Sequence, residues 1–129
     1  MSRRKDREAA LKVLFQIENK TLAINKNTAY EVLELKYDSF SGQIVEGVIE
    51  HEEELVSYIT PHLKNWTYDR LNKIDKVLLK MASYEITYKD TPIKVIVDEY
   101  VELSKMYSDD DQYKFIHGVI SKLNQDKEK

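Results

Sequence analysis

The sequence predicts an all-α protein, a single domain of six to seven helices arranged as two small packed helical subdomains. Apolar residues recur at three- and four-residue steps along most of the chain, which is the spacing of one helix face. Only three glycines and two prolines are present, too few for the turns of an all-β chain. With 129 residues and 42% hydrophobic content, the chain can bury one substantial core. We place the N-terminal subdomain, with a basic arm, at 1–60, the C-terminal subdomain at 61–125, and a frayed tail at 126–129.

The first predicted helix runs from Arg3 to about Asn19. Its apolar residues follow helical spacing, and they are Ala9, Ala10, Val13, Leu14 and Ile17. Four cations occupy its first turns, where positive charge opposes the helix macrodipole. An anionic ligand would explain this placement. A solvated basic terminus would explain it equally well.

The middle of the chain is predicted to hold a loop and two helices. Residues 20–28 are polar, and a short helix is expected around Thr28–Leu35. Ser39 or Ser41 could cap a longer helix that follows, because a serine hydroxyl accepts from the first free amides. Pro61 bounds the end of that helix or the start of a short successor that includes Leu63. The residues expected to face inward are Ile44, Val45, Val48, Ile49 and Leu55.

Three further segments complete the prediction. A connector at 66–71 has Thr67 as a candidate N-cap. A core helix begins at Leu71 and ends near 89–90, and Thr91-Pro92 begins the next helix. Acidic residues at 109–111 precede the last helix, where they complement its dipole. The apolar face of the core helix consists of Ile74, Val77, Leu78, Met81, Ala82 and Ile86.

Composition predicts a cytoplasmic protein that does not enter a membrane. The chain has no cysteine, so it has no disulfide framework, which fits a reducing compartment. Its N-terminus lacks the apolar core of a signal peptide, and no apolar run reaches membrane-spanning length. The formal net charge is −3, but residues 1–12 hold five basic side chains against two acidic ones. A basic arm on an acidic body would steer an anionic partner locally.

The sequence predicts no metal site, no cofactor site and no enzyme. The three histidines, His51, His62 and His117, are scattered without ligand-spaced companions. The three glycines are isolated, so no loop can cradle phosphates. The acidic residues occur in runs typical of a solvated helix surface, whereas catalytic carboxylates need burial or coupling to shift their pKa.

Three features could carry function. The basic cluster in the first helix can neutralise phosphates and stack arginine planes on unpaired bases. Lys114 and Phe115 can place a cation on a phosphate and a ring on a base, although a helical Phe is more often core. The same choice between core and contact applies to Phe15. The acidic surface could receive a basic protein, or it could simply confer solubility.

These features sit within a longer pattern that resembles the NusB family over nearly the whole chain. The pattern begins with the basic run and continues through residues 7–15 and Gly47-Val48. It then includes Trp66, Arg70-Leu71, Ile74-Asp75-Lys76 and Tyr84-Glu85-Ile86. The densest part lies in residues 92–105 and in Phe115-Ile116-His117-Gly118-Val119-Ile120.

The resemblance implies an all-α, two-subdomain, RNA-binding factor of transcription antitermination. It implies binding of single-stranded boxA RNA in nascent ribosomal transcripts, as a heterodimer with the small-subunit ribosomal protein that acts as NusE. With other Nus factors, contacted indirectly, such complexes let RNA polymerase read through terminators.

The resemblance also implies roles for individual positions. The RNA-contacting positions are Arg3, Arg4, Lys5, Arg7, Lys114 and Phe115. We add Lys12 to the expected RNA contacts as a further cation of the basic arm. Phe15, Asp75 and Asp111 match positions on the surface facing the partner and the RNA, and we assign them to the partner. Departures from the family pattern are Asp6 within the basic run and Asp98 and His117 where asparagine is usual.

Three alternatives remain open from the sequence. One is the NusB-like RNA-binding module of ribosomal RNA cytosine methyltransferases. A second is a pure protein–protein adaptor whose basic arm is incidental. A third is a self-associating regulator, a homodimer that covers its own RNA surface.

Overall fold

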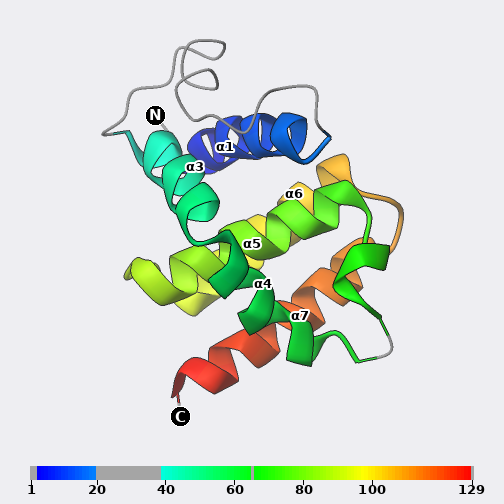
Figure 1. The fold of residues 1–129 in the computed structure, drawn as a ribbon. Helices are drawn as coiled ribbons and strands as arrows, with labels where there is room; N and C mark the ends of the chain where they lie inside the picture. Colours follow the sequence, from blue (N-terminus) through cyan, green and yellow to red (C-terminus); the bar gives the residue numbers. More distant parts are fainter. Residues whose placement is uncertain (1–2, 20–38, 65, 129) are drawn as a thin grey trace.

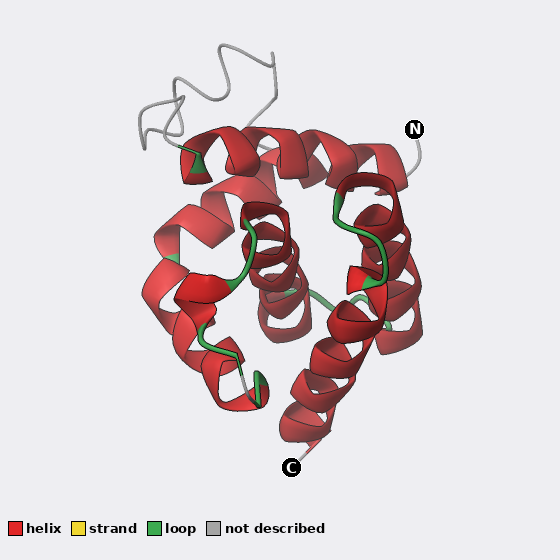
Figure 2. Cartoon of the chain, turned by 90° about the vertical axis from the view of Figure 1, so that its right-hand side faces the viewer, coloured by secondary structure: helices red, strands yellow, loops and turns green. Residues whose placement is uncertain are grey.

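The described part of the chain, residues 3–19, 39–64 and 66–128, is built from helices and loops alone (Figure 2). The structure is a computed structural model, and of residues 125–128 it describes only the backbone. The elements are α1 (Arg3–Glu18), α3 (Phe40–Glu50), α4 (Glu52–Ile59), η1 (Thr60–His62), η2 (Tyr68–Arg70), α5 (Lys73–Tyr88), α6 (Ile93–Tyr107) and α7 (Gln112–Glu128). The predicted all-α class is confirmed, whereas the predicted loop at 20–28 and helix at Thr28–Leu35 lie outside the described residues.

Helix α5 lies in the middle of the molecule and contacts α1, α3, α4, α6 and α7 (Figure 1). The helix is amphipathic but broadly buried, with residues 77–83 enclosed by its neighbours. Helix α1 and the C-terminal end of α7 lie at opposite ends of the molecule in both views (Figures 1 and 2). The buried apolar side chains of the α-helices form one cluster around α5. The division into subdomains at residue 60 stays a prediction.

The first helix agrees with its prediction to within one residue, since α1 ends at Glu18. Ser39 caps α3, because its hydroxyl accepts a 3.0 Å hydrogen bond from the amide of Gly42. The single longer helix predicted after this cap is wrong. The chain breaks at His51, where φ is −110° and ψ is 22°, into α3 and α4. The break directs α4 against α5 and α7, where Leu55 and Ile59 are fully buried.

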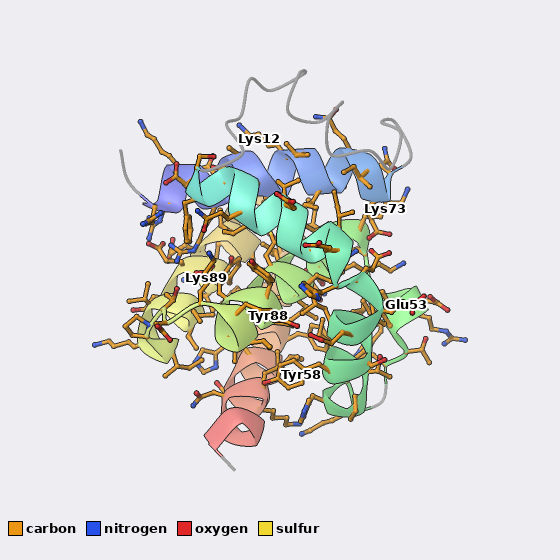
Figure 3. The ribbon with its side chains drawn as sticks, turned by 60° about the vertical axis from the view of Figure 1, so that its left-hand side comes forward. Lys12, Glu53, Tyr58, Lys73, Tyr88 and Lys89 are labelled. Carbon is orange, nitrogen blue, oxygen red and sulfur yellow. The ribbon has the colours of Figure 1, made fainter. Side chains whose placement is uncertain are left out.

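The C-terminal helices follow the predicted order. Asn72 caps α5 by accepting a 2.7 Å hydrogen bond from the amide of Asp75. Thr67 precedes η2 without a side-chain capping bond. The backbone of α7 remains helical to Glu128, whereas the sequence predicted fraying from residue 126. The hydroxyl of Tyr58 on α4 anchors this helix by donating to the carbonyl oxygen of Leu123 at 2.6 Å (Figure 3). None of the described helices combines the length and apolar character needed to cross a membrane.

Gly47 allows α3 to lie directly against α5. A Cβ atom at this position would stand 2.1 Å from Cε1 of Tyr84, far inside van der Waals contact. We expect Gly47→Ala to lower the free energy of unfolding by about 1 kcal/mol, because displacing a packed ring outweighs the gain of ~1 kcal/mol from helix propensity. Denaturant unfolding would measure the change. Gly118→Ala is the matched control, and equal stability of the two variants would contradict this account.

Candidate nucleic-acid interface

The first turn of α1 presents three cations at the surface. Arg3, Arg4 and Lys5 are exposed. The guanidinium of Arg3 lies 4.0 Å from the centre of the Phe40 ring, a cation–π contact. The Nε of Arg4 donates to Oε2 of Glu99 at 2.7 Å, and this hydrogen bond raises the pKa of Arg4. The turn therefore offers positive charge that the protein only partly neutralises.

Lys12 lies farther along the same helix and is also exposed. In Figure 3 it lies on α1 at the end of the molecule away from α7. The structure thus places four of the five basic α1 residues expected to contact RNA on the surface of a single helix.

Arg7 is the exception, because its side chain is only 2% exposed. Its Nε and Nη2 donate to the two carboxylate oxygens of Glu85, each at 2.7 Å. Glu85 also accepts from the Thr91 hydroxyl at 2.9 Å and from the Tyr100 hydroxyl. Burial disfavours the charge of Arg7, but the hydrogen bonds and charge of Glu85 prevail and raise its pKa. Burial, reinforced by Glu85, raises the pKa of Tyr100 well above 10.

The prediction that Arg7 contacts RNA is therefore corrected. Its guanidinium is committed to Glu85 inside the protein and is not displayed with its basic neighbours. The sequence held a signal for this placement. Arg7 stands three, four and seven residues before Ala10, Leu11 and Leu14, so it lies on the buried face of α1.

Lys114 and Phe115 lie in the first turn of α7. The Lys114 side chain is 69% exposed, with its Nζ 3.9 Å from a carboxylate oxygen of Asp111. Phe115 is half-buried and packs against the core, so it acts as both a core residue and a surface ring. Its ring centre lies 6.2 Å from that of Trp66, which is 51% exposed. The exposed Lys114 therefore lies beside a partly accessible aromatic surface, and its contact with RNA stays a prediction.

A cleft of about 290 Å³ adjoins this pair, between the segment after η1 and the helix α7. Sequence reasoning missed several of its side chains, because they come from segments far apart in the chain. Only the fold brings them beside Lys114 and Phe115, and they are Lys64, Trp66 and Lys122.

The three residues expected to face a partner have different environments. Phe15 is half-buried on the C-terminal half of α1. Asp111 is exposed, with a positive φ of 68° in the turn before α7. Asp75 is fully buried, so its assignment to a partner-contacting surface is corrected.

Asp75 instead ties the start of α5 to the turn between α6 and α7. Its Oδ1 accepts from the Ser108 hydroxyl at 2.8 Å, and its Oδ2 accepts from the side-chain amide of Gln112. Burial raises the pKa of its carboxyl, although both hydrogen bonds oppose the rise. Asp75 therefore positions the interface without being exposed in it. Gln112, which it binds, is the first residue of the helix that carries Lys114 and Phe115.

Comparison with known proteins decides the family. The NusB family matches residues 4–125. Transcription antitermination protein NusB of Macrococcus caseolyticus is 46% identical over 129 residues, covering 98% of this chain and 99% of its own length. The protein of the same name from Bacillus subtilis is 41% identical over 127 residues, covering 98% of this chain and 97% of its own. This chain belongs to the NusB family.

Solved structures agree with the NusB assignment. NusB of T. maritima aligns with a TM-score of 0.82 and 27% identity, covering 97% of this chain and 92% of its own. A chain in a structure titled "Crystal Structure of a Plectonemic RNA Supercoil" aligns with a TM-score of 0.84 at 24% identity. The alignment covers 96% of this chain and 94% of that chain. The second likeness concerns the fold alone. Within the described residues, no group of three or more His, Cys, Asp or Glu could hold a metal ion.

The buried ion pair of this NusB protein predicts a large stability effect. Glu85→Gln leaves the charge of Arg7 buried without a counter-ion, so we expect the free energy of unfolding to fall by about 3–5 kcal/mol. Glu99→Gln is the matched control, because it removes the partner of the exposed Arg4 and should change stability far less. Denaturant unfolding compares the two variants. Equal losses in the free energy of unfolding would show that the buried Arg7–Glu85 pair contributes no more to stability than the Arg4–Glu99 pair.

Asp75 predicts a dependence of stability on pH. Because its pKa is raised in the folded state, the folded protein binds this proton more tightly than the unfolded chain does. The resulting stabilisation is complete below the ordinary value of 3.8 and is lost as pH rises through the folded value. We therefore expect wild type to gain stability relative to Asp75→Asn as pH falls from neutral toward 3.8. Urea unfolding across this range would test it, and a constant difference would contradict the raised pKa.

Proposed function

We propose that this protein is an RNA-binding factor of transcription antitermination. It binds single-stranded boxA RNA together with the small-subunit ribosomal protein that acts as NusE. The complex, with other Nus factors, helps RNA polymerase read through terminators in ribosomal RNA operons, in the cytoplasm. Full-length relatives at 41% and 46% identity are named transcription antitermination proteins, which supports the proposal.

The observation that carries the RNA-binding part is the exposed basic turn of α1. Arg3, Arg4 and Lys5 lie on the surface at the helix end where cations oppose the macrodipole. The macrodipole disfavours cations in this position, and an RNA backbone would offset that cost by supplying several phosphates in succession. Lys12, Lys114 and Phe115 complete the proposed RNA surface, because all three are accessible side chains of suitable chemistry.

The proposed protein partner would use the surface around Phe15 and Asp111. Asp111 is exposed together with Asp109 and Asp110, forming an acidic edge at the turn before α7. A basic ribosomal protein would complement this edge while the RNA occupies the neighbouring cations. The two ligands would then meet at the N-terminal end of α7.

The test measures fluorescence anisotropy of a labelled boxA RNA against a scrambled RNA, with and without the ribosomal partner, at two salt concentrations. We expect a preference for boxA that sharpens when the partner is added. Equal binding to both RNAs, abolished by salt, would favour the protein–protein adaptor instead. Sedimentation at increasing protein concentration distinguishes the third alternative, since a homodimer that covers its RNA surface would dissociate on adding RNA.

Removing the three exposed cations of α1 should weaken RNA binding without unfolding the protein. For the triple variant with Arg3, Arg4 and Lys5 changed to Ala, we expect the slope of log affinity against log salt to become shallower by about 2, since each phosphate neutralised on a single strand contributes ~0.7. Lys94→Ala provides the control for removing one exposed charge elsewhere, on α6. An unchanged slope in the triple variant would remove the basic turn from the interface.

A further inference from the structure

The cleft beside Phe115 has features that the RNA surface described above does not use. Its walls come from the segment around η1, from Trp66 and from one face of α7. The residues that line it are His62, Leu63, Lys64, Trp66, Lys114, Phe115, Gly118, Val119 and Lys122.

Its charge is entirely positive among the described residues that line it. Lys64, Lys114 and Lys122 line the cleft, and none of its described lining residues is acidic. The pKa of Lys122 is lowered, by partial burial first and by the neighbouring ammonium of Lys64 second. Because Lys64 and Lys122 line the same cleft and carry like charges, an anion bound between their ammonium groups would be stabilised.

Its aromatic wall is accessible to a ligand. Trp66 is 51% exposed, and its ring is supported by Phe115, which is partly embedded in the core. A flat exposed ring beside lysines is the usual platform on which an unpaired base stacks while its phosphate meets a cation. An acidic peptide would use the lysines but would leave the tryptophan face unexplained.

Gly118 adds an independent observation. It lies within α7, where glycine is a poor helix former, yet a Cβ atom here would meet no described atom within 4 Å. Packing within the described part of this chain therefore gives no reason for a glycine at this position. Its missing side chain leaves open space in the lining of the cleft, where a ligand backbone could approach the helix closely.

We propose that this cleft is an additional contact for single-stranded RNA, in which Lys64 and Lys122 bind phosphates, the RNA backbone passes over Gly118, and one base stacks on Trp66. The inference rests on the proposed function. It extends the RNA path from the start of α7 along two turns of that helix and adds four residues to the interface.

The chain contains a single tryptophan, so Trp66 reports directly on the cleft. Tryptophan fluorescence and anisotropy of labelled boxA RNA are followed in the same titration, with the full-length protein and with the ribosomal partner present and absent. We expect quenching of Trp66 that saturates together with the anisotropy. Binding by anisotropy without quenching would overturn the cleft contact and leave the proposed function intact. No RNA binding under any condition would remove both, and quenching by the partner protein alone would assign the cleft to the protein.

Four substitutions then separate the contributions. Lys64→Ala and Lys122→Ala should each make the salt slope shallower by about 0.7, more than Lys94→Ala. Trp66→Ala should weaken RNA binding by about 5- to 150-fold, whereas Trp66→Phe should retain most of the affinity because it keeps a stacking ring.

Gly118 supplies the sharpest variant. Gly118→Gln fills the cleft but meets no packed neighbour at its Cβ position, so it should fold with at least the wild-type melting temperature and still bind RNA more weakly. Circular dichroism and the anisotropy titration measure the two properties on the same sample. A stable Gly118→Gln protein with wild-type RNA affinity would overturn the proposed path over α7.

Discussion

The buried pair of Arg7 and Glu85 is the interaction on which the arrangement of α1, α5 and α6 depends. Arg7 belongs to α1, Glu85 to α5, and Glu85 also accepts from Tyr100 of α6. Burying two charges is costly unless further hydrogen bonds satisfy them, and Glu85 meets this condition with Thr91 as well. The pair allows little freedom of placement, because any shift of α1 along α5 would separate two charges inside the core.

This constraint determines what the rest of α1 can present. With Arg7, Ala10, Leu11 and Leu14 facing inward, Lys12 and the first-turn cations point to solvent. The helix therefore combines a structural arginine and surface cations within a few residues. Helix α5 likewise carries both a buried and an exposed lysine. Buried Lys80 donates to Glu18 at 2.8 Å and to Glu52 at 2.6 Å, whereas Lys73 is exposed. Residue type alone does not distinguish a cation that holds helices together from one that meets a ligand.

Much of the fold could be predicted from local patterns. The apolar spacing of α1 and α5 and the Ser39 cap depend on neighbours within a few residues, which the sequence displays directly. The break at His51 could not be predicted, because no glycine or proline marks it and the helical hydrogen bonds continue on both sides. It depends instead on the packing of α4 against α5 and α7, which is a property of the whole chain.

The candidate site was less predictable than the fold, because it too depends on contacts between segments far apart in the sequence. Exposed Lys114 and half-buried Phe115 are adjacent in sequence, so their pairing was visible, whereas Lys64 and Lys122 become neighbours only through the fold. Resemblance to a family transfers positions but not burial, which is why Arg7 and Asp75 were expected at surfaces.

The net charge of −3 does not describe the surface that an anionic ligand would meet. Several carboxylates of this acidic chain serve its own cations, as Glu85 serves Arg7 and Glu18 serves Lys80. These carboxylates neutralise charge inside the protein, and none of the described residues that line the cleft around Lys64 and Lys122 is acidic. An anionic ligand meets only the surface charge that internal ion pairs do not neutralise. In this protein that charge is positive at the first turn of α1 and along α7.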